Sequence, residues 1–503
     1  MKYFKILLFG LLFASCDNFL DIPSKTTLST DVYYQSKEDF EQGLNGVYSI
    51  LRSLYSGSDG AWAMGELRSD NTTYAFNPND RGTISAEFVK NFQDDANNSV
   101  SYHKYADDYS IISNANYLLE NIDNVSFDQQ AKNNIKGQAL FLRAFAYFDL
   151  VQYFGKVPLH LTPVKKLSDA TQPLASVDSV YDQIIADAKL ASELLPDKMA
   201  QESGRVSMGT AKMLLGNVYI NQRKWADAEK VLKEISGYRL LDNYADVFDP
   251  ANKNNEESLF EVQFKEGNDG YASNFFYVFL AQPITAEEVT AITGIPEVAR
   301  IVEGYNIPTP DIIKAYEGGD LRKDASIGML TAHGVEYPYI KKYCHTHAVS
   351  GITNDNWPVY RYAETLLFIA EALNEQGKTD EALTYLNQVR KRAGLNDCEV
   401  TNQGLLREAI LNERRVELAF ENKRWLDLIH SGKVESVMKA YGDRVKANPQ
   451  DYYFPEGYGV APQSYTDIRI LFPLPAAEAA LTTYFLFTSG GGISLFLSSD
   501  IGG

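Results

Sequence analysis

The chain has 503 residues, 45% of them hydrophobic and 12% aromatic, with 32 tyrosines, which is enough to form a large buried core. Its formal net charge is −19 and its isoelectric point is about 4.9. These values disfavour nucleic acid as a partner, because binding to phosphates requires a basic surface. An acidic chain rich in tyrosine suits a protein that faces neutral ligands.

The first sixteen residues, MKYFKILLFGLLFASC, have the features of a signal peptide. A short basic start precedes an apolar run from Ile6 to Phe13, which is too short to span a bilayer. Two small residues then precede Cys16, an arrangement that resembles a bacterial lipoprotein signal, in which the cysteine becomes lipid-modified; ordinary cleavage near an unrelated cysteine is the alternative. We expect residues 1–16 to be the signal peptide and Cys16 to be the lipidation site.

The spacing of small and apolar residues predicts hairpins of two antiparallel helices. The clearest covers residues 359–395, where apolar residues recur at helical spacing on both sides of a break at Gly377. Ala370 and Ala382 lie twelve residues apart, where the helices must approach closely, and Gly216 and Ala228 repeat this spacing. The pattern is that of a tetratricopeptide repeat, which buries its apolar face by stacking on neighbours. Such hairpins are expected at about 131–195, 207–237, 359–395 and 405–432.

Residues 17–503 are expected to form a single, mainly α-helical domain in which these four hairpins make a frame. Two non-repeat blocks, about 55–100 and 237–358, interrupt the frame. The first is rich in Gly, Ser, Asn and Asp, and the second contains the strand-like segment SLFEVQF and several turns, which predicts a few short strands. Loops this long are usually functional or disordered, so we expect these loop-rich blocks to pack on the frame and to face the ligand.

Side chains suited to sugars lie in both blocks. A sugar ring offers an apolar C–H face to Trp or Tyr and a fringe of hydroxyls to Asp, Asn or Arg. In the first block these residue types cluster around one tryptophan, either as a binding surface or as a loop that packs its aromatic rings on the frame. The predicted ligand-binding residues of this block are Trp62, Arg68, Asp70, Asn71, Tyr74 and Asn77.

The second block adds Tyr271, Tyr305 and Trp357 as predicted ligand-binding residues. Trp357 directly precedes a predicted helix, so it could instead pack as an apolar staple at the helix start. Trp225 and Trp425 lie within the predicted helical pairs and are expected in the core.

Motifs of catalysis are absent from the sequence, which contains no HExxH, no GxSxG and no glycine-rich dinucleotide fingerprint. Cys344, His345 and His347 are close enough in sequence to suggest a metal site, but consecutive strand residues point to opposite faces and no second half-site exists. Cys344 and Cys398 are expected to be free, buried thiols. The chain is therefore expected to be a binding protein, with no enzymatic activity, no cofactor and no metal.

Several long stretches resemble the SusD/RagB-like outer-membrane lipoproteins of Bacteroidetes. They occur in the family's order and cover most of the chain. They are CDNFLDIPS after the lipid site, GQALFLRAFAYFDLVQYFGKVPL, WADAEKVL, YADVFDPANKNNEESLFEVQF, IPTPDIIKAYEGGDLRKDASI, the hairpin at 359–395 and LNERRVELAFENKRWLDLIHSGK. After Glu478 the chain departs from the family, because its end is apolar and glycine-rich instead of polar.

The resemblance implies a lipid-anchored protein on the cell-surface side of the outer membrane. It implies capture of an oligosaccharide on the face away from the repeats, and delivery of that ligand to a SusC-like TonB-dependent transporter. Two alternatives stay open: a tetratricopeptide adaptor that binds a protein or peptide in its helical groove, and a SusD-like protein for a nutrient other than a glycan.

Overall fold

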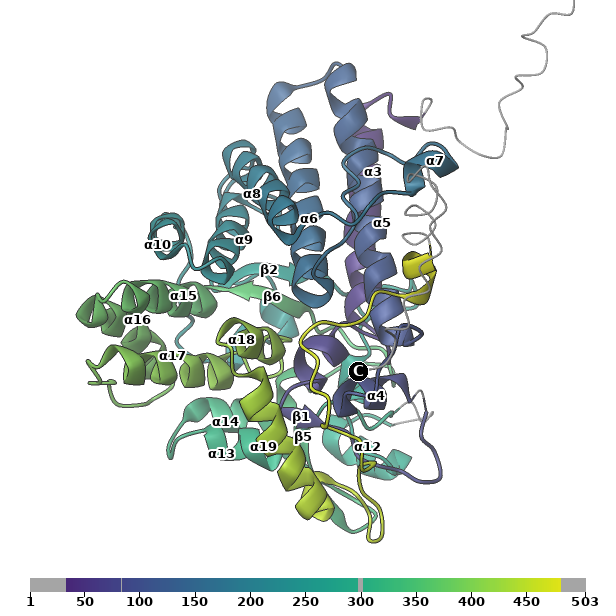
Figure 1. Cartoon of the computed structure of the whole chain (residues 1–503), viewed down its shortest axis with the longest axis vertical. Helices are drawn as coiled ribbons and strands as arrows, with labels where there is room; N and C mark the ends of the chain where they lie inside the picture. The colour runs from purple at the N-terminus through teal and green to yellow at the C-terminus, as the bar shows by residue number, and fades with distance from the viewer. Residues whose placement is uncertain (1–32, 83, 297–301, 481–503) are drawn as a thin grey trace, which may run out of the picture.

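The computed structural model describes residues 33–82, 84–296 and 302–480 (Figure 1). The predicted signal peptide, Cys16 and most of the unusual terminus lie outside the described residues. The described chain is mainly helical with a few short strands, as the sequence predicts.

Four long helices pack together in the upper part of Figure 1: α3 (Lys37–Tyr55), α5 (Ser99–Asn121), α6 (Gln129–Phe154) and α8 (Val177–Leu194). Each begins at a side chain that accepts a hydrogen bond from a backbone N–H of the first turn. These capping residues are Ser36, Asn98, Asp128 and Ser176. The connections between these helices hold η4 (Ile122–Asn124) and α7 (Leu167–Ala170).

Two helical hairpins that are far apart in sequence stack against each other. One consists of α9 (Met208–Asn221) and α10 (Trp225–Lys233), and the other of α15 (Tyr362–Glu375) and α16 (Thr379–Arg392), with α10 packed on α15. The first hairpin is close-packed, because a Cβ added at Gly216 would lie 2.3 Å from Leu232 Cδ2. The identity of the hairpins as tetratricopeptide repeats stays a prediction.

The last helical pair differs in its packing from a simple hairpin. Helix α17 (Gln403–Glu417) packs mainly on α15 and α16, whereas α18 (Arg424–His430) contacts η3 (Ala63–Leu67) of the first block and α19 (Val434–Ala447). Arg414 and Glu417 of α17 both form ion pairs, each with residues of other elements. Arg414 pairs with Asp427 and Glu364.

The two non-repeat blocks are more regular than their composition suggests. The first contains η3, β1 (Thr72–Thr73) and α4 (Ser85–Asn91). Strand β1 pairs with β3 (Ile307–Pro308), β2 (Ser258–Val262) with β6 (Trp357–Arg361), and β4 (Ile327–Ala332) with β5 (Val335–Ile340), all antiparallel. The short helical segments are η5 (Ala245–Val247), η6 (Pro250–Asn252), α11 (Phe275–Val278), α12 (Ala286–Thr293), α13 (Pro310–Ala315), α14 (Leu321–Ser326), η7 (Lys341–Tyr343) and η8 (Pro449–Tyr452).

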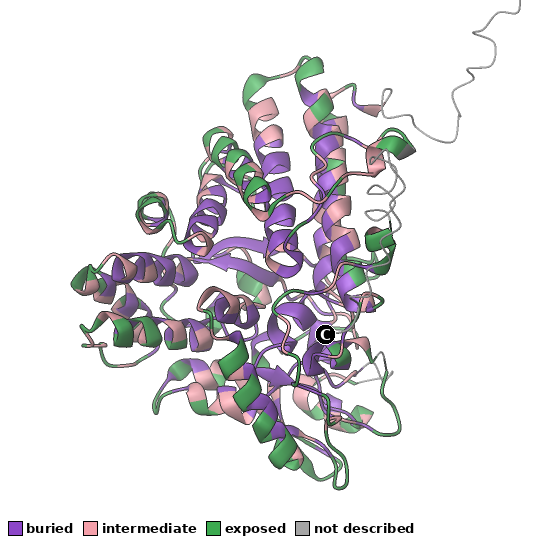
Figure 2. Ribbon diagram, in the orientation of Figure 1, coloured by how far each residue is buried: buried purple, intermediate pink, exposed green. Residues whose placement is uncertain are grey.

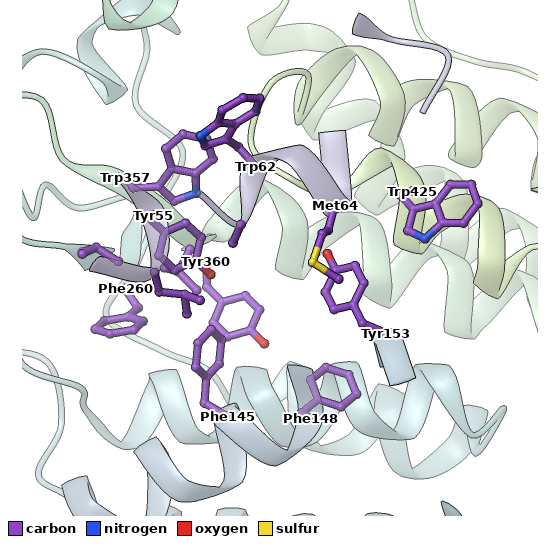
Figure 3. Packing of buried hydrophobic residues seen from close by; sticks show 14 of the residues in the cluster. Tyr55, Trp62, Met64, Phe145, Phe148, Tyr153, Phe260, Trp357, Tyr360 and Trp425 are labelled. Atoms are coloured by element: carbon purple, nitrogen blue, oxygen red, sulfur yellow. The ribbon is translucent and has the colours of Figure 1, made fainter. Parts of the chain in front are cut away.

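Strands β2 and β6 lie at the junction between the helices and the second block, and every residue of both strands is buried (Figure 2). Trp357 of β6 stacks on Tyr55 of α3 and on Tyr343 of η7, with ring centroids 5.5 and 5.4 Å apart. Figure 3 shows this part of the core, where Tyr55 lies against Trp357. Trp62 and Trp357 both contact Phe279, with ring centroids 5.0 and 6.5 Å apart. The junction therefore joins the helical frame and the loop-rich blocks through one aromatic core.

Candidate ligand-binding surface

Eight of the nine predicted ligand-binding residues are buried, each with at most 6% of its surface exposed. They are Trp62, Arg68, Asp70, Asn71, Tyr74, Asn77, Tyr305 and Trp357. The ninth, Tyr271, is 47% exposed. Their ligand contacts stay a prediction, and the structure gives each of them a role in packing.

Trp62 lies in the aromatic core behind the surface. Its ring centroid is 5.0 Å from that of Phe279 and 6.0 Å from that of Tyr305, and its indole N–H donates to the carbonyl of Gly57 at 3.1 Å. The hydroxyl of Tyr305 donates in turn to the carbonyl of Arg81 at 3.3 Å. These contacts connect the core to the loop that contains Arg81.

The charged members of the set form buried ion pairs. Arg68 donates to Asp94 at 2.7 Å, while Asp70 receives Arg424 and Arg415, each at 2.8 Å. Burial alone would raise the pKa of the Asp70 carboxyl, but the guanidinium groups of Arg424 and Arg415 outweigh it and hold that pKa well below its usual range. These groups are paired inside the protein, which leaves them no free charge for a ligand.

Asp70→Asn tests this structural role through pH. A carboxyl whose pKa is lowered by folding adds stability above its unfolded pKa of about 3.9, and this stability is lost as pH falls. We expect the variant to lose about 1.5–3 kcal/mol of unfolding free energy at neutral pH, and the gap to the wild type to narrow as the solution is acidified. Urea unfolding across a pH series measures this gap, and a gap that stays constant would contradict the assignment.

Asn71, Tyr74 and Asn77 make side-chain hydrogen bonds that fix the course of the first block. The Asn71 side chain donates to Glu66 at 3.0 Å, and Asn77 donates to Gln282 at 3.3 Å. The hydroxyl of Tyr74 accepts from the amide of Asn91 at 2.8 Å. Together these bonds hold the segment on both sides of Phe76.

A group of aromatic rings reaches the surface just beyond these buried residues. We define the aromatic face as Phe76, Tyr337, Tyr453 and Tyr458 with Arg81. Phe76 and Tyr458 have ring centroids 5.3 Å apart, as do Phe76 and the buried Phe454 beneath it. Tyr337 and Tyr453 lie 5.7 Å apart, and Tyr458 is 46% exposed.

Backbone and ion-pair contacts hold the aromatic face together. The N–H of Phe76 donates to the carbonyl of Tyr453 at 3.3 Å, and the hydroxyl of Tyr453 donates to the carbonyl of Pro308 at 2.7 Å. Tyr453 has a φ of 68°, a left-handed conformation that is uncommon for a bulky residue and often marks a functional site. The Arg81 guanidinium lies 4.6 Å from the Phe76 ring centroid and donates to Glu87 at 3.0 Å.

The sequence reasoning missed the aromatic face because its members come from three distant segments. The available signal was the stretch YYFPEGY at 452–458, in which aromatic residues surround a Pro/Gly turn. Exposed aromatic residues in such a loop are typical of binding sites.

Two further parts of the described chain bear on other predictions. Cys344 and Cys398 are free, as expected, but half-buried. His345 contacts Asp355, and His347 contacts Tyr277; within residues 33–480 as described, no group of His, Cys, Asp and Glu is arranged to hold a metal ion. None of the described helices is both long and apolar enough to span a membrane.

Comparison with known proteins decides the family. Residues 306–482 match the model of the SusD family, and residues 18–220 match a second model described as "Starch-binding associating with outer membrane". The chain belongs to the SusD/RagB family. SusD-like proteins are non-catalytic binding proteins that associate with the outer membrane, so this chain is not an enzyme.

Relatives match the chain over most of its length. It is 28% identical over 472 residues to SusD-like protein P25 of Formosa agariphila, and the aligned region covers 84% of this chain and 88% of that protein. It is 22% identical over 388 residues to the starch-binding protein SusD of Bacteroides thetaiotaomicron, covering 64% and 68%. The solved structure of a "Laminarin binding SusD-like protein" superimposes with a TM-score of 0.71 at 25% identity, covering 89% of this chain and 98% of that one.

Proposed function

We propose that this protein captures an oligosaccharide on the aromatic face, at the outer surface of the cell. Lipid on Cys16 anchors it to the outer membrane, and the ligand passes to a SusC-like TonB-dependent transporter. The observation that carries the proposal is the aromatic face itself, which groups half-exposed and exposed rings beside an exposed arginine. The names of two relatives, a laminarin-binding and a starch-binding protein, favour a glucan as the ligand class.

The chemistry of the aromatic face suits a neutral sugar chain. The rings of Phe76 and Tyr458 offer flat apolar surface to the C–H faces of successive sugar units. Asn79 and Arg81, on the exposed loop that follows Phe76, offer polar groups to the hydroxyls. In this proposal Tyr74 and Asn77 position the aromatic face from behind, and the other buried residues of the predicted set keep the core in place.

Removing the half-buried ring of Phe76 and the exposed ring of Tyr458 tests the proposal. We expect Phe76→Ala with Tyr458→Ala to weaken binding to laminarin and starch by roughly tenfold or more, because about 0.5–1.5 kcal/mol is lost for each ring contact. Isothermal titration calorimetry measures the affinity, and thermal melting checks that the variant is folded. Tyr385→Ala on α16 removes a half-buried ring on the helical side and serves as the matched control. Unchanged affinity of the double variant for every glycan would refute the aromatic face as the site.

The adaptor alternative has an observation of its own. A pocket of about 280 Å³ lies among α10, α15, α17 and α18, with the half-buried Trp225 at its edge, 6.0 Å from the ring of His430. Such a pocket could receive an apolar side chain of a peptide. A peptide ligand that binds the Phe76/Tyr458 double variant normally but is lost on Trp225→Ala would favour the adaptor over glycan capture.

A further inference from the structure

An open groove on the surface shares no residue with the aromatic face. It encloses about 630 Å³ between α3, the loop at 203–205 before α9, and the segment 261–271 after β2 begins. Helix α3 contributes Asn45, Tyr48, Ser49 and Arg52. These positions are three or four residues apart, so they line one face of the helix.

Three cationic side chains line this groove. The Arg52 guanidinium carbon lies 4.7 Å from the ring centroid of Tyr271, and that of Arg205 lies 4.9 Å from the ring centroid of Tyr48. Lys265 is exposed, and its backbone N–H donates to the carbonyl of Tyr271 at 2.8 Å. The two ring contacts place the guanidinium groups over the aromatic rings, and the backbone bond places Lys265 beside Tyr271.

The groove has one lining carboxylate, and that group already accepts hydrogen bonds from the protein. Glu261 is the lining carboxylate, and its oxygens accept from the Asn356 amide at 2.8 Å and from the Asn254 N–H. Glu202, outside the lining, lies 3.4 Å from Arg205. In the part of the chain that the structure describes, Arg52 and Lys265 form no ion pair within 4 Å. The groove is thus locally positive in a chain whose net charge is −19.

The groove wall is built by close packing. Gly204 has a φ of +84°, and a Cβ there would lie 3.0 Å from the Gln263 side chain, so the loop at 203–205 lies directly against Gln263. The Gln263 amide donates to Asn254 at 2.9 Å, which fixes its position. Tyr271, with 47% of its surface exposed, provides an open ring at the other edge.

We propose that this groove binds an acidic sugar unit, one that carries a carboxylate or a sulfate. Guanidinium groups form strong, directional hydrogen bonds with both anions. The exposed ring of Tyr271 and the polar side chains of Asn45, Ser49 and Gln263 match the C–H face and the hydroxyls of the same unit. This second site goes beyond glycan capture at the aromatic face. Its role in nutrient uptake rests on the proposed function, whereas its binding of an acidic sugar does not depend on that function.

Gly46 provides a sharp test, because it lines the groove and a Cβ added there meets no atom within 4 Å. Gly46→Glu adds a carboxylate to the lining of the groove at a position open to a Cβ, and Gly46→Ala is the matched control. The probes are an oligogalacturonate for the carboxylate, a sulfated galactan oligosaccharide for the sulfate, laminarihexaose as a neutral glycan and an oligoglutamate peptide. Calorimetry on the purified full-length protein measures each affinity at low and high salt, and circular dichroism checks folding.

We expect at least one acidic oligosaccharide to bind, and to bind more weakly at high salt because exposed charges are screened. Gly46→Glu and the double variant Arg52→Gln with Lys265→Gln should each weaken this binding by roughly tenfold or more, as expected when charge-assisted hydrogen bonds are lost. Gly46→Ala and the Phe76/Tyr458 double variant should leave it unchanged.

The proposal is overturned if neither acidic oligosaccharide binds, or if the groove variants leave their binding intact. Equal binding of oligoglutamate would replace the sugar by an acidic peptide and would also overturn it. If the wild-type protein binds an acidic oligosaccharide but no laminarihexaose, the result would count against the aromatic face and in favour of the groove. The two proposals therefore fail separately.

Discussion

Arg361→Ala is expected to lower the free energy of unfolding by about 3–5 kcal/mol, because it leaves buried carboxylates without their partner. The Arg361 side chain is 1% exposed, and its Nη1 donates to Glu257 at 2.6 Å and to Glu417 at 3.0 Å. Its Nε donates to Glu421 at 2.7 Å. Urea unfolding followed by tryptophan fluorescence measures the loss.

The size of this effect follows from the charge on Glu417. Burial alone would raise the pKa of the Glu417 carboxyl, but Arg392, Arg361 and Arg322 hold it well below its usual range. The carboxylate is therefore charged at neutral pH and depends on all three guanidinium groups. Removal of Arg361 takes away one of these three groups. It also leaves Glu257 with Arg392 in place of two arginine partners.

An exposed ion pair provides the control. Arg407, with a side chain that is 46% exposed, pairs with Glu375 at 2.6 Å. Since surface pairs contribute little, Arg407→Ala should cost less than about 1 kcal/mol. If the two variants unfold at the same urea concentration, the buried network does not carry the stability assigned to it.

This network also joins the helices to the second non-repeat block. Arg361 joins β6 to α15, Glu417 ends α17, and Arg392 ends α16. Arg322 extends the network into α14 of the second block, where it pairs with Glu413 and Glu417. The ion pairs thus tie three helices of the frame to the loop-rich part that supports the aromatic face.

The helices were predictable because their signals are local. For α3, the capping residue Ser36 and an apolar stripe at helical spacing both stand in the sequence of the helix itself. The hairpins at Gly216 and Ala370 were predictable for the same reason, since close helix packing requires small residues at fixed spacing.

The individual residues of the candidate ligand-binding surface could not be predicted, because the burial of a loop residue depends on contacts from distant segments. Trp62 has the composition of a sugar site around it, yet Phe279 and Tyr305, more than 200 residues further on, cover its ring. Tyr458 sits in a stretch with no helical or strand pattern, and it joins the aromatic face through its contact with Phe76. Spacing along the chain carries no information on either contact.

Trp62→Ala separates a core role from a ligand role for the tryptophan at the centre of the predicted site. The Trp62 side chain is fully buried, so its removal should leave a cavity and lower the unfolding free energy by about 3–5 kcal/mol. Trp225→Ala, at a half-buried position, should cost less. Urea unfolding measures the loss of unfolding free energy in both variants.

The decisive measurement on Trp62→Ala is glycan affinity at a temperature where the variant remains folded. Trp62 reaches the aromatic face indirectly, through Tyr305 and the carbonyl of Arg81. We therefore expect the affinity of the folded fraction to change by less than about threefold, well below 1.4 kcal/mol. A tenfold loss in fully folded protein would mean that the ring reaches the ligand, which requires the cover of Phe279 and Tyr305 to open on binding. Stability and affinity, measured on the same sample, therefore assign Trp62 either to the core or to the site.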